Sequence, residues 1–211
     1  MGFATFDMYV AYMYYAAMEK PQYRKRSQVT TKLRQEAENL FGAAALAMHD
    51  VVLTAFDALD LRTTTDAAAL ILLLQSGKLS IGTLAGLLDL EHSSMVRVGD
   101  RLVRRSLITR DPDPVDARRA VLALTPAGVS LAERALEVRQ KALATMLLPS
   151  DQREIEAMRA LLSKILTNHT TGRRSADRLC RLCDEDSCGG DQCPVERAAI
   201  SKSTNSAPSL P

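Results

Sequence analysis

The stretch that decides the fold is SIGTLAGLLDLEHSSMVRVGDRLVRRSLITRDPDPVDARRAVLALTP, Ser80 to Pro126. Its first part, residues 80–90, opens with an N-cap serine and repeats apolar residues on one face, which predicts a short helix. A turn at Asp89, a residue that tolerates the left-handed conformation, precedes a second helix with a polar outer face. Two extended runs, Leu107–Arg110 and Ala120–Thr125, flank a loop rich in proline and aspartate, which predicts a β-hairpin. Helix, turn, helix and hairpin in this order predict a winged helix-turn-helix.

Helical patterns flank this stretch on both sides. Apolar residues recur at helical spacing from Thr31 to Leu59, and Thr63–Asp66 is an N-cap cluster before an apolar helix that ends at Gly77. Thr125-Pro126 predicts the start of a helix that runs to about residue 147, and Pro149-Ser150 predicts the start of another. The predicted fold is therefore mainly α with a small β-hairpin wing, a winged helix-turn-helix core plus N- and C-terminal dimerisation helices. A monomeric helical subdomain is the alternative interpretation of these flanking helices.

Three segments are predicted along the 211 residues. Residues 1–30 form an aromatic N-terminal extension, residues 31–168 the winged helix-turn-helix domain with its dimerisation helices, and residues 169–211 a cysteine-rich tail with a disordered C-terminus. The DNA-binding part covers about residues 63–125. The extension is apolar, but Asp7 lies inside it and no basic residue precedes it, so packing on a partner surface is favoured over a membrane anchor. We expect a cytoplasmic protein.

Positive charge is concentrated in the winged helix. The net charge of +2 is too small to imply a polyanionic partner by itself, yet seven arginines stand against five acids between Glu91 and Arg119. Any one of these arginines alone is better explained by the solvated face of a helix. Their convergence on one motif favours double-stranded DNA, with the second helix in the major groove and the hairpin loop at the flanking backbone or minor groove.

The same residues resemble the MarR family of transcriptional regulators from about Leu33 to Leu166. The resemblance is strongest between Leu79 and Gly128, where Asp116-Ala117-Arg118 is followed by Val121-Leu122-Ala123-Leu124-Thr125-Pro126-Ala127-Gly128. It implies an obligate homodimer whose terminal helices interleave. It also implies a repressor or activator at a palindromic operator, relieved by a small-molecule effector or by thiol oxidation.

The resemblance also implies which residues meet DNA. Ser93, Ser94 and Arg97 would contact bases or phosphates, and Arg118 would sit at the wing with Asp116 holding it in place. Two further arginines of the same basic surface complete the candidate set: Arg101 and Arg119. Val96 and Gly99 depart from the family pattern, because many relatives have a polar and a larger apolar residue there.

No enzyme is predicted. The three histidines are scattered, and the sequence has no glycine-rich phosphate loop and no nucleophile elbow. The predicted function is a DNA-binding transcriptional regulator, a repressor that acts as a homodimer.

All four cysteines lie in CRLCDEDSCGGDQCPVE, near the C-terminus. The spacing C-x2-C-x4-C-x4-C predicts a metal site at Cys180, Cys183, Cys188 and Cys193, with zinc or an iron–sulfur cluster as the cofactor. Redox-active thiols are the second interpretation, and a static disulfide knot ranks far behind because a reducing compartment disfavours it. A metal would order a glycine-rich segment too short to have its own core. The tail would then change DNA affinity through the spacing of the recognition helices.

A different class of function competes with this prediction. A metal- or redox-carrying protein with the same cysteine tail could use its winged helix for protein–protein contacts. Salt-dependent binding to duplex DNA separates the two classes, since neutralised phosphates release counterions.

Overall fold

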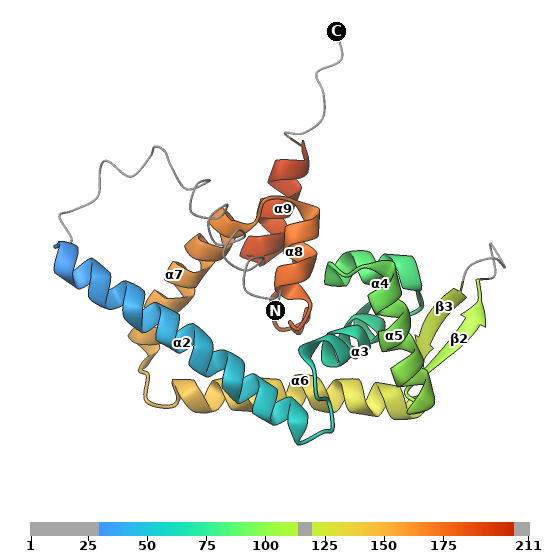
Figure 1. Cartoon of the computed structure of the whole chain (residues 1–211). Coiled ribbons are helices and arrows are strands. Elements are labelled where there is room, and N and C mark those ends of the chain that lie inside the picture. The colour runs from blue at the N-terminus through green and yellow to red at the C-terminus, as the bar shows by residue number, and fades with distance from the viewer. Residues whose placement is uncertain (1–29, 114–119, 205–211) are drawn as a thin grey trace, which may run out of the picture. The chain divides into compact units, whose positions relative to one another are not determined.

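The computed structural model describes residues 30–113 and 120–204. The chain divides into two compact units, residues 1–45 and 46–211. The helices and strands, most of them labelled in Figure 1, are α2 (Thr31–Asp57), α3 (Thr64–Ser76), β1 (Leu79–Ser80), α4 (Ile81–Leu88), α5 (His92–Arg104), β2 (Ile108–Pro112), β3 (Ala120–Leu124), α6 (Pro126–Leu147), α7 (Gln152–His169), α8 (Arg173–Cys180), the 3-10 turn η1 (Gly190–Gln192) and α9 (Pro194–Thr204). The mainly helical class with a small β wing is confirmed.

Local capping signals set where the helices begin and end. The side-chain oxygens of Thr63, Ser80 and Thr125 each accept a hydrogen bond from the backbone N–H three residues on, at 3.2, 3.0 and 3.0 Å. These bonds satisfy donors that the first turn of a helix leaves without a partner. Gly77, with φ of 75°, ends α3 in a conformation that glycine adopts at little cost. The predicted boundaries at these four residues are confirmed.

The core of the winged helix forms around α3. This helix is apolar on nearly every side, and the residues from Asp66 to Leu73 are all buried. It packs against α4, α5, α6 and strand β3, and Phe56 from the end of α2 joins the same cluster. Burial of each large side chain contributes about 2 kcal/mol, so this cluster is the main source of stability for the second unit.

The sheet has three antiparallel strands in the order β1-β3-β2. Leu79 of β1 pairs with Leu122, and Ile108 of β2 pairs with Leu124. The sequence predicted the hairpin of β2 and β3 but not β1. Two residues are too few to show the alternation by which a strand is recognised.

Two structural features position α5. Asp89 caps α4 in the left-handed conformation, with φ of 55° and ψ of 46°, as its sequence predicted. Met95, Val98 and Leu102 then point into the core, so the other side of α5 faces outward. The turn and the buried face together fix the direction of the helix expected to read DNA.

Residues 169–204 fold, contrary to the prediction of a tail without a core. Helices α8 and α9 lie side by side and α9 also packs on α7 (Figure 1). Ala176, Val195 and Ala199 are buried in a small cluster of their own. Their burial needs α8 and α9 to meet across the cysteine loop, which no local pattern in the sequence reveals.

Helices α2 and α7 bury few of their apolar side chains. Val52 and Phe56 are the buried residues of α2, and no residue of α7 is buried within the part of the chain that the structure describes. Among the described residues, α2 is also the one helix long and apolar enough to cross a membrane, judged by length and composition alone. The aromatic extension, for which a membrane anchor was the less favoured interpretation, lies outside the described residues.

Candidate nucleic-acid interface

The outer face of α5 carries the predicted base-reading residues. Ser93 and Arg97 are exposed and Ser94 is half-buried, all within the first two turns of the helix. Glu91 caps this helix without a side-chain hydrogen bond, so it does not occupy the N–H groups of the first turn. Hydroxyl groups and an N-terminal helix end suit contacts with phosphate oxygens, and an arginine suits the edge of guanine.

Arg101 has a partner inside the protein. Its Nε donates to Asp66 Oδ2 at 3.0 Å and its Nη2 donates to Asp66 Oδ1. Asp66 is only 2% exposed. The hydrogen bond to this carboxylate raises the pKa of Arg101. Arg101 therefore joins α5 to the start of α3, a role that sequence reasoning missed because the two residues are 35 positions apart.

Arg105 and Arg110 are paired in the same way. Arg105 Nη1 donates to the backbone oxygen of Asp60 at 2.8 Å, and its Nη2 lies 3.2 Å from Asp60 Oδ2. Arg110 Nη2 lies 3.0 Å from Asp100 Oδ1. Among the described residues, Arg97 and Arg104 are the arginines of α5 that have no such partner. The basic face predicted from the sequence thus contains two groups of arginines. Arg101, Arg105 and Arg110 form ion pairs within the protein, whereas Arg97 and Arg104 are exposed and can contact DNA.

The glycine at position 99 leaves room for the ion pair between Arg110 of strand β2 and Asp100 of α5. A Cβ at this position would lie 3.3 Å from Arg110 Nη2 and 3.8 Å from Leu122 Cδ1. A glycine lets the guanidinium of Arg110 cross the helix to reach Asp100. The departure from the family pattern at this position therefore has a packing reason.

The tip of the wing lies outside the described residues. Asp116, Arg118 and Arg119 all fall between residues 114 and 119. Their assignment to the DNA surface stays a prediction. The strands that lead into the tip are paired through Pro112 and Ala120.

The turn between α4 and α5 is held by the C-terminal segment. Arg174 Nη2 lies 2.8 Å from Asp89 Oδ1, and Arg178 Nη1 lies 3.6 Å from Asp89 Oδ2. Both arginines belong to α8, which packs on α4. Sequence reasoning assigned nothing to these contacts, since a pair of arginines 85 and 89 residues downstream gives no local signal.

The four cysteines gather at the loop between α8 and α9. Cys180 ends α8 and Cys193 immediately precedes α9, and all four thiols are free. The thiol of Cys183 interacts with the thiols of Cys180 and Cys188. The interaction with Cys180, together with the charge of Arg139, lowers the pKa of Cys183 to about 6 even though burial opposes the shift. The interaction with Cys183, together with burial, raises the pKa of Cys180.

These thiols do not form a finished metal site. Within residues 30–113 and 120–204, no three side chains of His, Cys, Asp or Glu stand in position to hold one ion together. Their interactions are electrostatic: Cys183 acts on Cys180 and Cys188, and the charge of Cys193 acts on the same two thiols.

Comparison with known proteins agrees with this architecture. The sequence model of the MarR family matches residues 63–120. A putative transcriptional regulatory protein for the hcr operon from Thauera aromatica is 43% identical over 56 residues, which cover 26% of this chain. The chain spans about a third, 34%, of the length of that relative.

Solved structures share the fold. The YusO protein from Bacillus subtilis superposes with a TM-score of 0.59 at 21% identity, over 67% of this chain and 97% of that one. A MarR family protein from Bacillus stearothermophilus gives 0.56 at 25% identity, over 65% and 95%. The C80S mutant of MarR from E. coli, complexed with operator DNA, gives 0.51 at 21% identity, over 61% and 92%.

The match of residues 63–120 covers α3, α4, α5 and the hairpin as far as the start of β3. These elements carry the outer face of α5 and the ties that hold it. The cysteine segment lies beyond the matched residues. Residues 63–120 of this chain are therefore similar to the MarR family, and the chain shares the winged helix-turn-helix fold of solved members, with a cysteine-rich C-terminal segment beyond the matched residues.

Proposed function

We propose that this chain binds double-stranded DNA as a homodimer and regulates transcription from a palindromic operator, as a repressor. Members of the MarR family are transcriptional regulators rather than enzymes and bind double-stranded DNA, and the relative from Thauera carries a regulatory name. A small-molecule effector or a metal or redox signal at the cysteines relieves repression. The protein works in the cytoplasm, where operator DNA is.

The observation that carries this proposal is the outer face of α5. Arg97 and Arg104 are exposed there without a described partner, while Arg101, Arg105 and Arg110 hold the helix in place. A recognition helix needs both kinds of arginine. The exposed arginines contact DNA, and the ion-paired arginines fix the orientation of the helix that presents them. Binding to genomic fragments recovered with the protein, measured over a series of salt concentrations, tests the proposal. The logarithm of affinity should fall linearly with the logarithm of salt.

We expect Arg97→Ala to lower the preference for the operator over random DNA. Loss of a good contact to a base edge costs about 1–3 kcal/mol of discrimination. Titration of operator and random duplexes at the same salt concentration measures this difference. If the affinities for the operator and for the random duplex fall equally, Arg97 contacts phosphate rather than a base.

Arg153→Ala is the matched control. Arg153 is also exposed, but it lies on α7 outside the winged helix. The charge change is the same, so any general electrostatic effect appears in both variants. We expect this variant to keep the operator preference of the natural protein.

The apolar surfaces of α2 and α7 support the homodimer. Leu40, Leu46 and Leu161 are largely exposed, although a leucine gains about 2 kcal/mol from full burial. A second copy of the chain would cover such surfaces. A two-fold dimer also places two recognition helices one DNA turn, about 34 Å, apart.

Leu161→Glu is expected to dissociate the dimer. The side chain is 55% exposed in the single chain, so a monomer would tolerate the change, whereas a buried interface would not accept the charge. Sedimentation at micromolar concentration should show a dimer for the natural protein and a shift of at least about tenfold toward monomer for the variant.

Ile200→Glu provides the comparison. Ile200 is 54% exposed and lies on α9, outside the helices proposed to form the interface. We expect this variant to remain a dimer. If the natural protein itself sediments as a monomer at micromolar concentration, the proposed homodimer is wrong, whatever the variants show.

A further inference from the structure

The last three helices of the chain share one small apolar core. Ala176 of α8 is buried together with Val195 and Ala199 of α9, and Leu166 of α7 packs against them. Helix α9 contacts both α7 and α8 along its length. Helices that share a close-packed core behave as one body, because separating them would open a cavity. A displacement of α7 is therefore passed on to α8.

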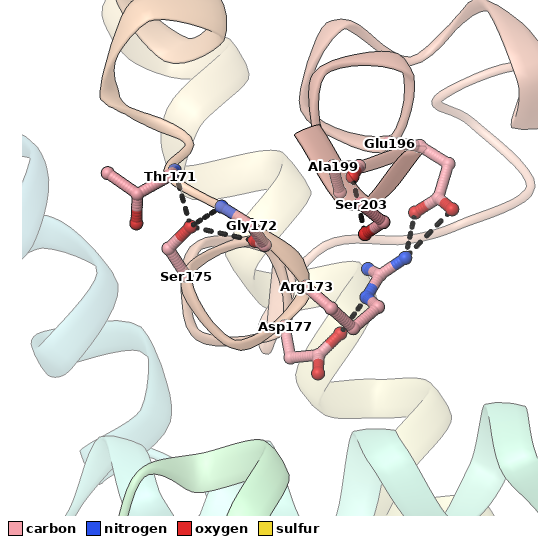
Figure 2. A network of polar contacts seen from close by, with 8 residues as sticks. All are labelled: Thr171, Gly172, Arg173, Ser175, Asp177, Glu196, Ala199 and Ser203. Atoms are coloured by element: carbon pink, nitrogen blue, oxygen red, sulfur yellow. Dashed lines mark hydrogen bonds and ion pairs between the residues drawn. The ribbon is translucent and has the colours of Figure 1, made fainter. Parts of the chain in front are cut away.

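Polar contacts add to the link between α8 and α9. Figure 2 shows Arg173 of α8 with Nη1 donating to Glu196 Oε1 of α9 at 2.8 Å, while its Nε donates to Asp177 Oδ1 at 2.7 Å. Ser175 Oγ accepts from the N–H of Gly172 at 3.1 Å and fixes the start of α8. The first turn of α8 is thus joined to the first turn of α9.

The segment that follows α8 is anchored to the core of the winged helix. Leu182 packs against the large buried cluster that forms around α3. The backbone oxygen of the next residue, Cys183, accepts a hydrogen bond from Gln75 Nε2 at 2.8 Å. Gln75 lies in the last turn of α3. Neither contact involves a thiol, so this anchor does not depend on the state of the cysteines.

Helix α8 also contacts the turn of the helix-turn-helix. It packs on α4, and its Arg174 and Arg178 both reach the carboxylate of Asp89, at 2.8 and 3.6 Å. Asp89 caps α4 in the left-handed conformation, three residues before α5 begins at His92. Exposed ion pairs change an equilibrium by about fivefold at most. Their effect is therefore to position a turn that is already folded, not to hold the fold together.

Helix α7 is thereby connected to α5 along two routes. One route is α6, which packs on α3. The other runs from α7 through α9 and α8 to α4 and the turn at Asp89. Two bodies that meet along one line of contact can still rotate about it. A second contact away from that line fixes the angle between them.

We propose that α8 and α9 form a brace that fixes the angle of α5 relative to α7 and so determines which half-site spacing the homodimer accepts. Asp89, Arg174 and Arg178 are its positioning residues, and they act through the turn before α5. The inference rests on the proposed function, because α7 is one of the helices proposed to form the dimer interface and α5 is the helix proposed to read DNA.

The preference for one half-site spacing is the quantity that tests the brace. The probes are a palindromic duplex from the genomic fragments recovered with the protein, and the same duplex with one base pair inserted or removed at its centre. One base pair moves a half-site by about 3.4 Å and turns it by about 34°. We expect the natural protein to bind both altered duplexes at least about tenfold more weakly, because a fixed α5 cannot follow the half-site.

Asp89→Asn is the first variant to measure. Asparagine tolerates the left-handed turn, but the change removes both ion pairs with α8. We expect this variant to bind the altered duplexes within about threefold of the original one. Loss of a negative charge raises the affinity for every duplex equally, so the ratio between duplexes is the informative quantity. The double variant Arg174→Gln and Arg178→Gln should lose the spacing preference in the same way.

Combining the substitutions separates positioning from direct contact with phosphate. If the two arginines act through Asp89, replacing them in the Asp89→Asn variant should leave the spacing ratio where it already is. If they contact phosphates instead, their loss lowers the affinity for every duplex equally in both backgrounds. The slope of log affinity against log salt then falls by about one for each arginine that is lost. That second result would overturn the proposal.

Arg197→Gln is the matched control. Arg197 is exposed on α9, and its replacement removes the same charge from the brace without touching Asp89. We expect this variant to keep the spacing ratio of the natural protein. The substituted side chains are exposed or half-buried, so each variant should give the circular dichroism spectrum of the natural protein.

The outcomes distinguish the brace from the proposed function. A natural protein that binds all three duplexes equally, or Asp89→Asn with an unchanged spacing preference, would overturn the inference and leave the proposed function intact. A protein that sediments as a monomer, or that binds no duplex at any salt concentration, would remove the proposed function and the brace together.

Discussion

Replacement of Arg101 by alanine is expected to lower the free energy of unfolding by about 3 kcal/mol. The change leaves the carboxylate of Asp66 buried at 2% exposure with its two side-chain donors removed. An uncompensated buried charge costs more than the ion pair contributed, and this is why single removals are severe. This expected loss of stability is at the lower end of the usual range because the side chain of Arg101 is 40% exposed. Urea denaturation followed by circular dichroism measures it.

Two further variants make this result specific. Asp66→Ala combined with Arg101→Ala should be more stable than Arg101→Ala alone, because no buried charge remains. Arg97→Ala should change stability by less than about 0.5 kcal/mol, since its side chain is exposed. If Arg101→Ala unfolds like the natural protein and loses only DNA binding, the residue acts as a DNA contact and the buried tie is unimportant.

Gly128→Ala is expected to destabilise the chain by about 3 kcal/mol, the upper end of the range for overpacked positions. A Cβ on Gly128 would lie 1.9 Å from the carbonyl oxygen of Leu107 and 3.0 Å from its carbon. Leu107 cannot rotate away, because these are backbone atoms and its oxygen accepts from Thr125 N at 3.0 Å. Helix α6 would have to move away from Leu107, the residue that immediately precedes β2. Thermal unfolding should show a clear fall in Tm.

Gly86→Ala is the matched control for this substitution. Gly86 lies inside α4, and a Cβ there would have nothing within 4 Å. Alanine should therefore stabilise the helix by about 0.5–1 kcal/mol. Equal effects of the two substitutions would contradict the steric account of Gly128.

The parts of the fold that were predicted correctly depend on local signals. Thr63, Ser80 and Thr125 precede helices that they cap through their own side chains, and Asp89 adopts the left-handed turn that its side chain tolerates. Each of these helix ends depends on one residue and on the backbone N–H three positions later, or on the conformation of a single residue. They can therefore be inferred from a single sequence without knowledge of packing.

The parts that were missed depend on residues far apart in the chain. The sequence offered Arg101 as a DNA contact, and only the fold shows that it meets a buried carboxylate 35 residues away. The C-terminal segment looked like an unfolded tail because small residues such as Ala176 and Ala199 carry no clear helical pattern. Their burial becomes visible only when α8 and α9 lie together.

The crossing of Arg110 over Gly99 has a consequence for how such sequences diverge. The guanidinium passes close to position 99, where a Cβ would lie 3.3 Å from Arg110 Nη2 and would push it by a few tenths of an ångström. A side chain larger than alanine at this position would crowd an arginine that follows the same course from position 110. The two sites are therefore expected to change together in evolution, so that glycine and arginine are inherited as a pair and lost as a pair.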